Sequence, residues 1–168
     1  NFDIIMLIRK SIIKKYRIKK LEENMLTIAY IGNGKSTNRY HLPFVLQRKD
    51  KIKVKKIFAR HPGKSEWDRI PDVMYTDNID ELLHDDEIDL IVICTRHDDD
   101  LHYNYAKMVL ESNKHCLVEK PFMSTAAQAG EIFSLAGEKG LIVQAYQNRR
   151  FDSDFLTVKK VIESGKLG

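Results

Sequence analysis

The stretch Leu26-Thr-Ile-Ala-Tyr-Ile-Gly-Asn-Gly-Lys-Ser-Thr37 decides the fold class. Its first six residues are a short apolar run, the pattern of a strand that is buried on both faces. Gly32 and Gly34 follow where that strand would end, and a helix is predicted over residues 36–49. A buried strand, a glycine turn and a helix in this order indicate the first unit of a parallel α/β sheet.

The same alternation continues along the chain. Further strands are predicted at residues 53–59, 73–76, 89–94, 115–119 and 141–145, and further helices at 77–84, 98–112, 125–139 and 152–164. Asp77 or Asn78 is available to cap the first of these helices, while Ser124 should begin and Gly140 should end the third. Apolar strands separated by helices predict a doubly wound, Rossmann-type parallel sheet covered on both faces. Ligands of such sheets bind beyond the carboxyl ends of the strands.

Charge and composition narrow the function classes. The 168 residues carry a net charge of +4, and residues 1–24, with seven Lys and Arg against three acidic residues, account for all of it. The remaining chain is neutral, which gives no electrostatic reason to expect a nucleic acid partner. No apolar run approaches the roughly 18 residues of a membrane-spanning helix. Cys94 and Cys116 are interpreted as reduced core thiols of a cytoplasmic protein.

Residues 1–24 have two interpretations. They are either a non-native upstream extension, with Met25 as the true start, or a basic amphipathic helix that lies on a membrane surface. We favour the extension, because a short amphipathic pattern is a common coincidence.

The turn after the first strand predicts a dinucleotide site. Gly32 permits a tight turn and Gly34 lets the backbone approach a pyrophosphate, which would then meet the N-terminus of the following helix at Lys35 and Ser36. The third glycine of this fingerprint is replaced by Thr37. A Walker phosphate loop is excluded, because the glycine that it would need at position 29 is an alanine. The alternative is an ordinary glycine turn.

The second strand end favours NADP over NAD. An acidic residue usually binds the ribose hydroxyls of NAD at this place, but here Ala59 is followed by Arg60. A cation without a carboxylate suits the 2′-phosphate of NADP. The alternative is that Arg60 is a solvated surface residue.

The fourth strand is followed by a polar cluster that contains Thr95 and His102, both predicted to contact the cofactor. The cluster also holds His97 and the aspartates at 98–100, which resemble a metal site. We interpret these aspartates instead as caps of the next helix, because neighbouring positions at a helix start diverge. No metal is expected.

Beyond the fifth strand, Lys120 stands between Glu119 and Pro121. A lysine beside a carboxylate at this edge can position a hydroxyl or share its proton, and a cis bond at Pro121 would turn it into the cleft. A surface salt bridge is the alternative. Gln147, after the sixth strand, is predicted to line the same cleft.

Four motifs of the chain belong together: Gly32-x-Gly34, Glu119-Lys-Pro121, Gly34-Lys-Ser-Thr-x-Arg-Tyr-His-x-Pro43 and Tyr146-Gln-Asn-Arg-Arg-Phe-Asp152. With them, the chain resembles the glucose–fructose oxidoreductase / inositol dehydrogenase (Gfo/Idh/MocA) family. The resemblance runs from about Leu26 to Gly168.

The resemblance implies a cofactor domain and a reaction. A family member binds NAD(P), with residues such as Glu119 and Lys120 at the site, and transfers a hydride between nicotinamide and a sugar or cyclitol. Lys120 would contact the nicotinamide ribose and the substrate and assist proton transfer. A second domain, a mostly antiparallel sheet, binds the substrate, forms the homo-oligomer and supplies an acid/base histidine; no histidine of this chain lies where the family places it.

The expected organisation is therefore an extension (1–24), a Rossmann domain (25–148) and the start of a truncated second domain (149–168). Such a chain should bind cofactor weakly and turn over little by itself. The alternative function is a non-enzymatic NAD(P)-binding sensor, because related sugar-responsive repressors use this fold.

Overall fold

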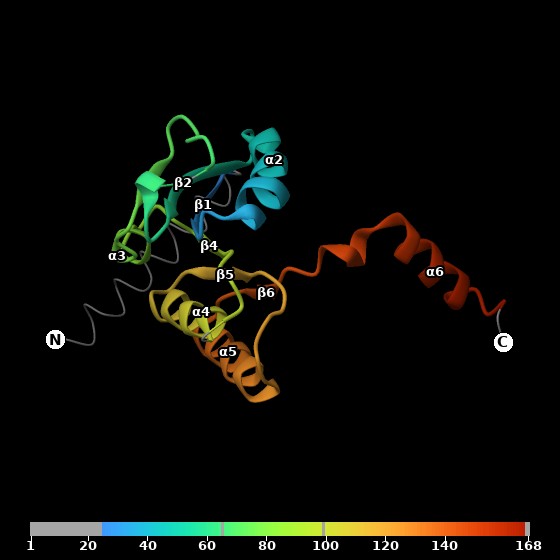
Figure 1. Ribbon diagram of the computed structural model, residues 1–168. Helices are drawn as coiled ribbons and strands as arrows, with labels where there is room; N and C mark the ends of the chain where they lie inside the picture. Colours follow the sequence, from blue (N-terminus) through green and yellow to red (C-terminus); the bar gives the residue numbers. More distant parts are fainter. Residues whose placement is uncertain (1–24, 65, 99, 167–168) are drawn as a thin grey trace.

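The computed structural model describes residues 25–64, 66–98 and 100–166 (Figure 1). The extension predicted at residues 1–24, and Asp99 of the acidic run, lie outside the described residues. In the part of the chain that the structure describes, none of the helices combines the length and the apolar character needed to cross a bilayer.

A six-stranded sheet forms the centre of the molecule, and every neighbouring pair of strands is parallel. Its order is β3-β2-β1-β4-β5-β6, so the chain moves outward in opposite directions from β1 and from β4. The strands are β1 (Leu26–Ile31), β2 (Ile52–Phe58), β3 (Met74–Thr76), β4 (Leu90–Ile93), β5 (His115–Val118) and β6 (Val143–Ala145). The predicted doubly wound sheet is confirmed, and its crevice lies beyond the carboxyl ends of β1 and β4.

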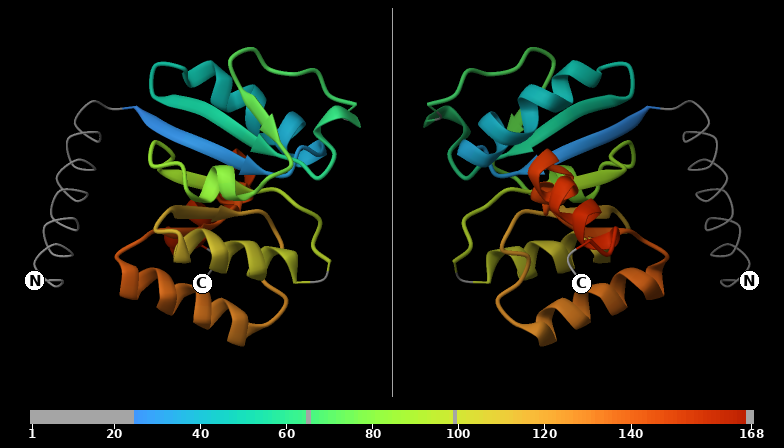
Figure 2. Two further views of the ribbon diagram at one scale, coloured as in Figure 1. Left: turned by 90° about the vertical axis from the view of Figure 1, so that its left-hand side faces the viewer. Right: turned by 90° about the vertical axis from the view of Figure 1, so that its right-hand side faces the viewer.

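One face of the sheet carries α3 (Asp80–Leu83), α4 (Leu101–Glu111) and α5 (Ala126–Lys139). Their apolar residues pack with Ile31, Ile91 and Ile93 in the larger core cluster. Figure 2 shows α4 and α5 side by side. Because β4 is apolar along its whole length and β1 is apolar except for Thr27, burial of both faces of these two strands removes the most apolar surface from water.

The opposite face is covered only in part. A helical segment packs Leu42 against Val54 and Ile57, on the side of β1 and β2. The segment was predicted as one helix, but it winds as a π-helix, η1 (Ser36–His41), then as α2 (Leu42–Val45) and as a 3₁₀ turn, η2 (Leu46–Arg48). Pro43 lies in the first turn of α2, where its missing N–H disturbs the preceding hydrogen-bond register.

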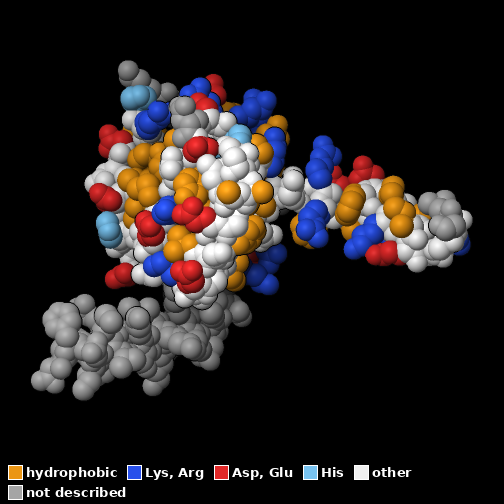
Figure 3. All heavy atoms as spheres, turned by 90° about the horizontal axis from the view of Figure 1, so that it is seen from below, with side chains coloured by type: hydrophobic (Ala, Val, Ile, Leu, Met, Phe, Trp, Pro, Cys, Tyr) orange, Lys and Arg blue, Asp and Glu red, His pale blue; other side chains and the backbone are white. Residues whose placement is uncertain are grey.

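The predicted final helix, assigned above to the start of a second domain, exists and does not cover the sheet. After η4 (Asn148–Phe151), α6 (Ser153–Glu163) projects away from the body (Figure 1). All its residues are exposed, and Ile162 keeps 61% of its surface. Figure 3 shows apolar side chains along this projecting helix. Among the described residues, the predicted cover on both faces is therefore confirmed for the side that carries α3, α4 and α5 and holds in part on the other side.

Helix ends differ from the prediction where a side chain has a better partner. The cap of α5 is Thr125, not Ser124, because Thr125 and Gln128 form a reciprocal capping box while Ser124 donates to Asp100 at 2.8 Å. Asp100 makes no side-chain cap for α4, so the predicted aspartate cap is wrong there. Gly140 ends α5 with φ +63° as predicted, and Asn78 accepts from the Asp80 N–H at 3.1 Å.

Candidate functional site

A cavity of about 370 Å³ opens at the carboxyl edge of the sheet. It lies between the half of the sheet that contains β1, β2 and β3 and the half that contains β4, β5 and β6. Four of the predicted site residues line it: Gly32, Gly34, Arg60 and Thr95. The other lining residues are Asn33, Phe58, Ala59, His61, Glu66, Trp67, Cys94, Arg96, Leu101 and Tyr105. The loops after β1, β2 and β4 and the start of α4 therefore meet around one space, as the topology requires.

The glycine turn forms the floor of this cavity. Gly32 has φ +111°, and a Cβ there would lie 2.5 Å from the carbonyl oxygen of Cys94, so only glycine fits. A Cβ on Gly34 would meet nothing within 4 Å, which leaves open space above its backbone. Thr37, in place of the third glycine, is fully buried and donates its hydroxyl to the Gly32 carbonyl at 2.7 Å. The buried threonine thus stabilises the glycine turn through this hydrogen bond.

The β2 side of the cavity is mixed in charge. Arg60 is exposed and Ala59 offers no carboxylate, as the sequence indicated, but Glu66 also lines the cavity. Trp67 forms a wall beside it, with the guanidinium carbon of Arg39 5.4 Å from its ring centroid. Neither Glu66 nor Trp67 was predicted from the sequence, because both lie in a loop without a periodic pattern.

After β4, Thr95 lines the cavity, whereas His102 does not. The Thr95 hydroxyl is buried and has no hydrogen-bond partner among the described residues. His102 is 1% exposed; its Nδ1 donates to the Pro121 carbonyl oxygen at 2.8 Å, and its Nε2 lies 3.2 Å from the Thr95 carbonyl oxygen. His102 is therefore placed as a link between two loops rather than on the cavity surface, where a cofactor contact was predicted.

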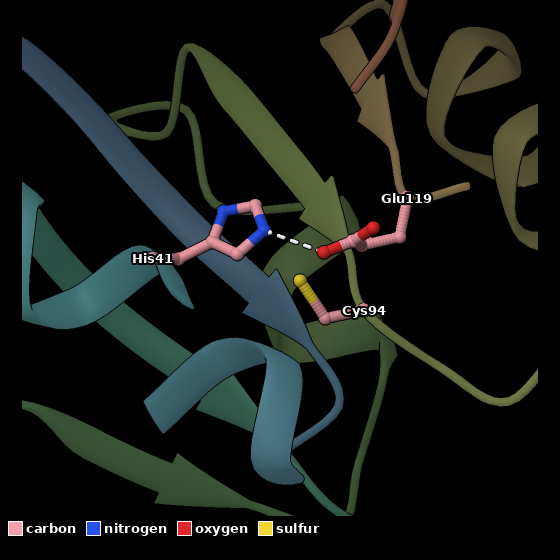
Figure 4. A group of neighbouring side chains, drawn as sticks. All are labelled: His41, Cys94 and Glu119. Carbon is pink, nitrogen blue, oxygen red and sulfur yellow. Dashed lines mark hydrogen bonds and ion pairs between the residues drawn. The ribbon is translucent and has the colours of Figure 1, made fainter. Parts of the chain in front are cut away.

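Directly after β5, Glu119 is buried and points toward His41 (Figure 4), whereas the next residue, Lys120, is exposed. Nε2 of His41 donates to Oε1 of Glu119 at 3.0 Å, and the backbone N–H of Lys120 donates to Oε2 at 2.9 Å. Burial favours the neutral carboxyl, but these two hydrogen bonds outweigh it and hold the pKa of Glu119 below its usual value. The Lys120–Pro121 peptide bond is cis, as predicted.

The remaining predicted residues lie at the same edge but outside the cavity lining. Lys35 is exposed at the start of the helical segment, Ser36 is half-buried as its first residue, and Gln147 is exposed just before η4. Glu119 and Lys120 are also absent from the lining. The structure therefore does not place any of these five residues beside the cavity wall that follows β2.

His41, Cys94 and Glu119 bring one donor atom each within 4.8 Å of one another (Figure 4). The three residues lie far apart in the sequence, so no local motif indicates this group. The described residues of the polar cluster around His97 form no such group. A histidine, a thiolate and a carboxylate are zinc ligands. Here, however, the histidine and the carboxylate already bond each other, and burial raises the pKa of the Cys94 thiol to about 12.

Comparison with known proteins gives one family model that matches residues 26–147, described as an oxidoreductase family with an NAD-binding Rossmann fold. An Escherichia coli protein named an uncharacterized oxidoreductase, YhhX, is 54% identical over 145 residues, 86% of this chain and 41% of the relative. A Bacillus subtilis protein named scyllo-inositol 2-dehydrogenase (NADP(+)), IolW, is 32% identical over 84% of this chain and 38% of its own length.

A solved structure, titled a probable oxidoreductase yhhX, superposes with a TM-score of 0.78 at 54% identity, covering 86% of this chain and 42% of that one. The chain thus spans about two fifths of the length of these relatives.

Proposed function

We propose, from the premise that this chain belongs to the Gfo/Idh/MocA family of oxidoreductases with an NAD-binding Rossmann fold, that its cavity binds NADP. We further propose that the whole protein transfers a hydride between that cofactor and a hydroxyl or carbonyl carbon of a sugar or cyclitol, as a homo-oligomer in the cytoplasm. IolW, whose name carries both NADP(+) and inositol, supports this choice of cofactor and substrate class.

The glycine turn at the switch point of the sheet carries the proposal. Gly32 is pressed against the Cys94 carbonyl, while open space remains above Gly34 at the start of the helical segment. A pyrophosphate needs such a close approach to backbone N–H groups. The unpartnered Thr95 hydroxyl and the open Gly34 backbone are features that a bound dinucleotide would use.

In this proposal, the residues at the carboxyl ends of the strands have distinct roles. The cofactor, when bound, supplies or accepts the hydride. Gly34, Lys35 and Ser36 hold the pyrophosphate, Arg60 holds the 2′-phosphate, and Thr95 and Gln147 contact the dinucleotide further along. Lys120 donates a hydrogen bond to the oxygen of the reacting carbon and moves a proton there. His102 and Glu119 support these contacts from behind, as their burial indicates.

Binding of NADP⁺ is expected to be about 10- to 100-fold tighter than binding of NAD⁺, because hydrogen bonds between charged groups contribute about 1.5–3 kcal/mol. Trp67 is the single tryptophan of the chain and lines the cavity, so its fluorescence should report both titrations. Arg60→Ala should remove most of the preference while leaving NAD⁺ binding within about twofold, since only the 2′-phosphate contact is lost.

The matched control is Arg48→Ala, which removes an exposed arginine that is paired with Asp50 and lies outside the cavity lining. It should bind both cofactors like the wild type. Tighter binding of NAD⁺ than of NADP⁺ would contradict the proposal and would assign the ribose contact to Glu66.

A further inference from the structure

The backbone around Lys120 is held from two sides by buried histidines that lie far from it in the sequence. On one side, His41 bonds Glu119, which accepts from the Lys120 N–H. On the other side, His102 donates to the carbonyl oxygen of Pro121. The exposed side chain of Lys120 therefore lies between a backbone N–H and a backbone carbonyl that both have buried partners, Glu119 and His102.

We propose that His41 is a positioning residue for Lys120 and acts through Glu119. This inference rests on the proposed function, in which Lys120 contacts the nicotinamide half of the dinucleotide. His41 itself is 5% exposed and does not line the cavity, so it cannot act by direct contact with a ligand there.

The two carboxylate oxygens of Glu119 have different hydrogen-bond donors. Oε1 accepts from His41 and Oε2 accepts from the Lys120 N–H, and the whole residue is 6% exposed. A buried carboxylate that loses one of two donors must find another partner or take up a proton. Either change would move the carboxyl group, and the Lys120 backbone would move with it.

The His41 ring is held in its orientation by the side chains around it. It stacks on Tyr146 with ring centroids 4.3 Å apart, and the edge of Tyr30 meets it at 5.9 Å. Leu42 begins α2 directly after it, and Pro43 follows in the first turn. The imidazole is therefore fixed by packing and by the backbone, which is what a residue needs in order to hold another side chain in place.

The bond between His41 and Glu119 connects two segments that are far apart in the sequence. His41 is the last residue of η1, the segment that starts at the glycine turn, whereas Glu119 follows β5, 78 residues later. The bond between them joins the proposed pyrophosphate site to the proposed catalytic lysine. Correct spacing of these two sites is what a ligand bound to both would require.

A double-mutant cycle on this chain tests the inference. His41→Phe keeps an aromatic ring but loses the donor, and it should weaken NADP⁺ binding about 10-fold. Binding of 2′,5′-ADP, which lacks the nicotinamide half, should change less than about twofold. Lys120→Ala should weaken NADP⁺ binding by a similar factor, and the double variant should be no weaker than either single variant. His41→Gln keeps a side-chain donor and should restore most of the affinity.

Three results would overturn the inference. Additive losses in the double variant would mean that His41 does not act through Lys120. An equal loss of 2′,5′-ADP binding would mean a general structural role for His41. Tight binding of Zn²⁺ that Cys94→Ala weakens would make His41 a metal ligand. Failure of the wild type to bind either nucleotide would instead contradict the proposed function, so the two failures are distinguishable.

Discussion

Gly32→Ala is expected to destabilise the chain by about 3–5 kcal/mol, from the strain of a non-glycine residue at φ +111° and from overpacking. The added Cβ would lie 2.5 Å from the carbonyl oxygen and 2.9 Å from the carbonyl carbon of Cys94, and both are backbone atoms at the end of β4. Cys94 directly follows β4, and its own N–H donates to the Ile31 carbonyl oxygen at 2.8 Å, so a shift of this residue would disturb the junction of β4 with β1. Urea denaturation followed by circular dichroism measures the loss.

Gly34→Ala is the matched control, because it adds the same methyl group two residues away. Its Cβ meets nothing within 4 Å, so the free energy of unfolding should change by about 1 kcal/mol or less. The methyl group should nevertheless weaken NADP⁺ binding, since it occupies the open space proposed for the pyrophosphate. Equal stability of Gly32→Ala and the wild type would show that the tight turn is not required.

Asp85→Asn is expected to cost about 2 kcal/mol at pH 7, the second large effect. The carboxylate of Asp85 is 11% exposed and pairs with Lys55 at 2.8 Å and with Lys56 at 2.9 Å, both on β2. Burial opposes its ionisation, but the hydrogen bonds from the two lysines prevail and lower the pKa of Asp85 to about 2. The ion pairs thereby attach the loop before β4 to the neighbouring half of the sheet.

The pH dependence follows from the direction of this shift. An aspartate with a lowered pKa stabilises the folded state above its unfolded value of about 4, and that contribution is lost as the pH falls to about 2. The difference in unfolding free energy between wild type and Asp85→Asn should therefore shrink between pH 4 and pH 2. Glu87→Gln is the control, because Glu87 pairs with Lys55 but is 67% exposed and should contribute little. A constant difference across that range would refute the assignment.

The sequence predicted the parts of the fold that depend on local patterns. The apolar run of β1 and the glycines after it are neighbours in the chain, so one short window holds the signal for a strand, a turn and the floor of the cavity. The remaining strands followed from the same reasoning, with ends displaced by one or two residues, because helix and strand termini depend on partners elsewhere.

Features set by long-range contacts could not be predicted in this way. His102 was expected on the cavity surface, but its position depends on the carbonyl of Pro121, 19 residues away. The pair of His41 and Glu119 spans 78 residues, and neither motif points to the other. Trp67 lies in a loop without a periodic pattern. The sequence placed the α6 helix outside the Rossmann domain, but its apolar pattern did not indicate that it projects from the body.

The pocket has a thermodynamic consequence, because its walls come from both halves of the sheet. The lining residues between positions 32 and 67 belong to the half of the sheet that contains β1, β2 and β3. The lining residues between positions 94 and 105 belong to the half that begins with β4. A dinucleotide bound there would contact both halves and would have to dissociate before either one unfolds alone. The melting temperature of the chain should then rise with cofactor concentration, by an amount equivalent to about 2.7 kcal/mol at 100 times the dissociation constant. A thermal-shift series would thus measure affinity without any turnover.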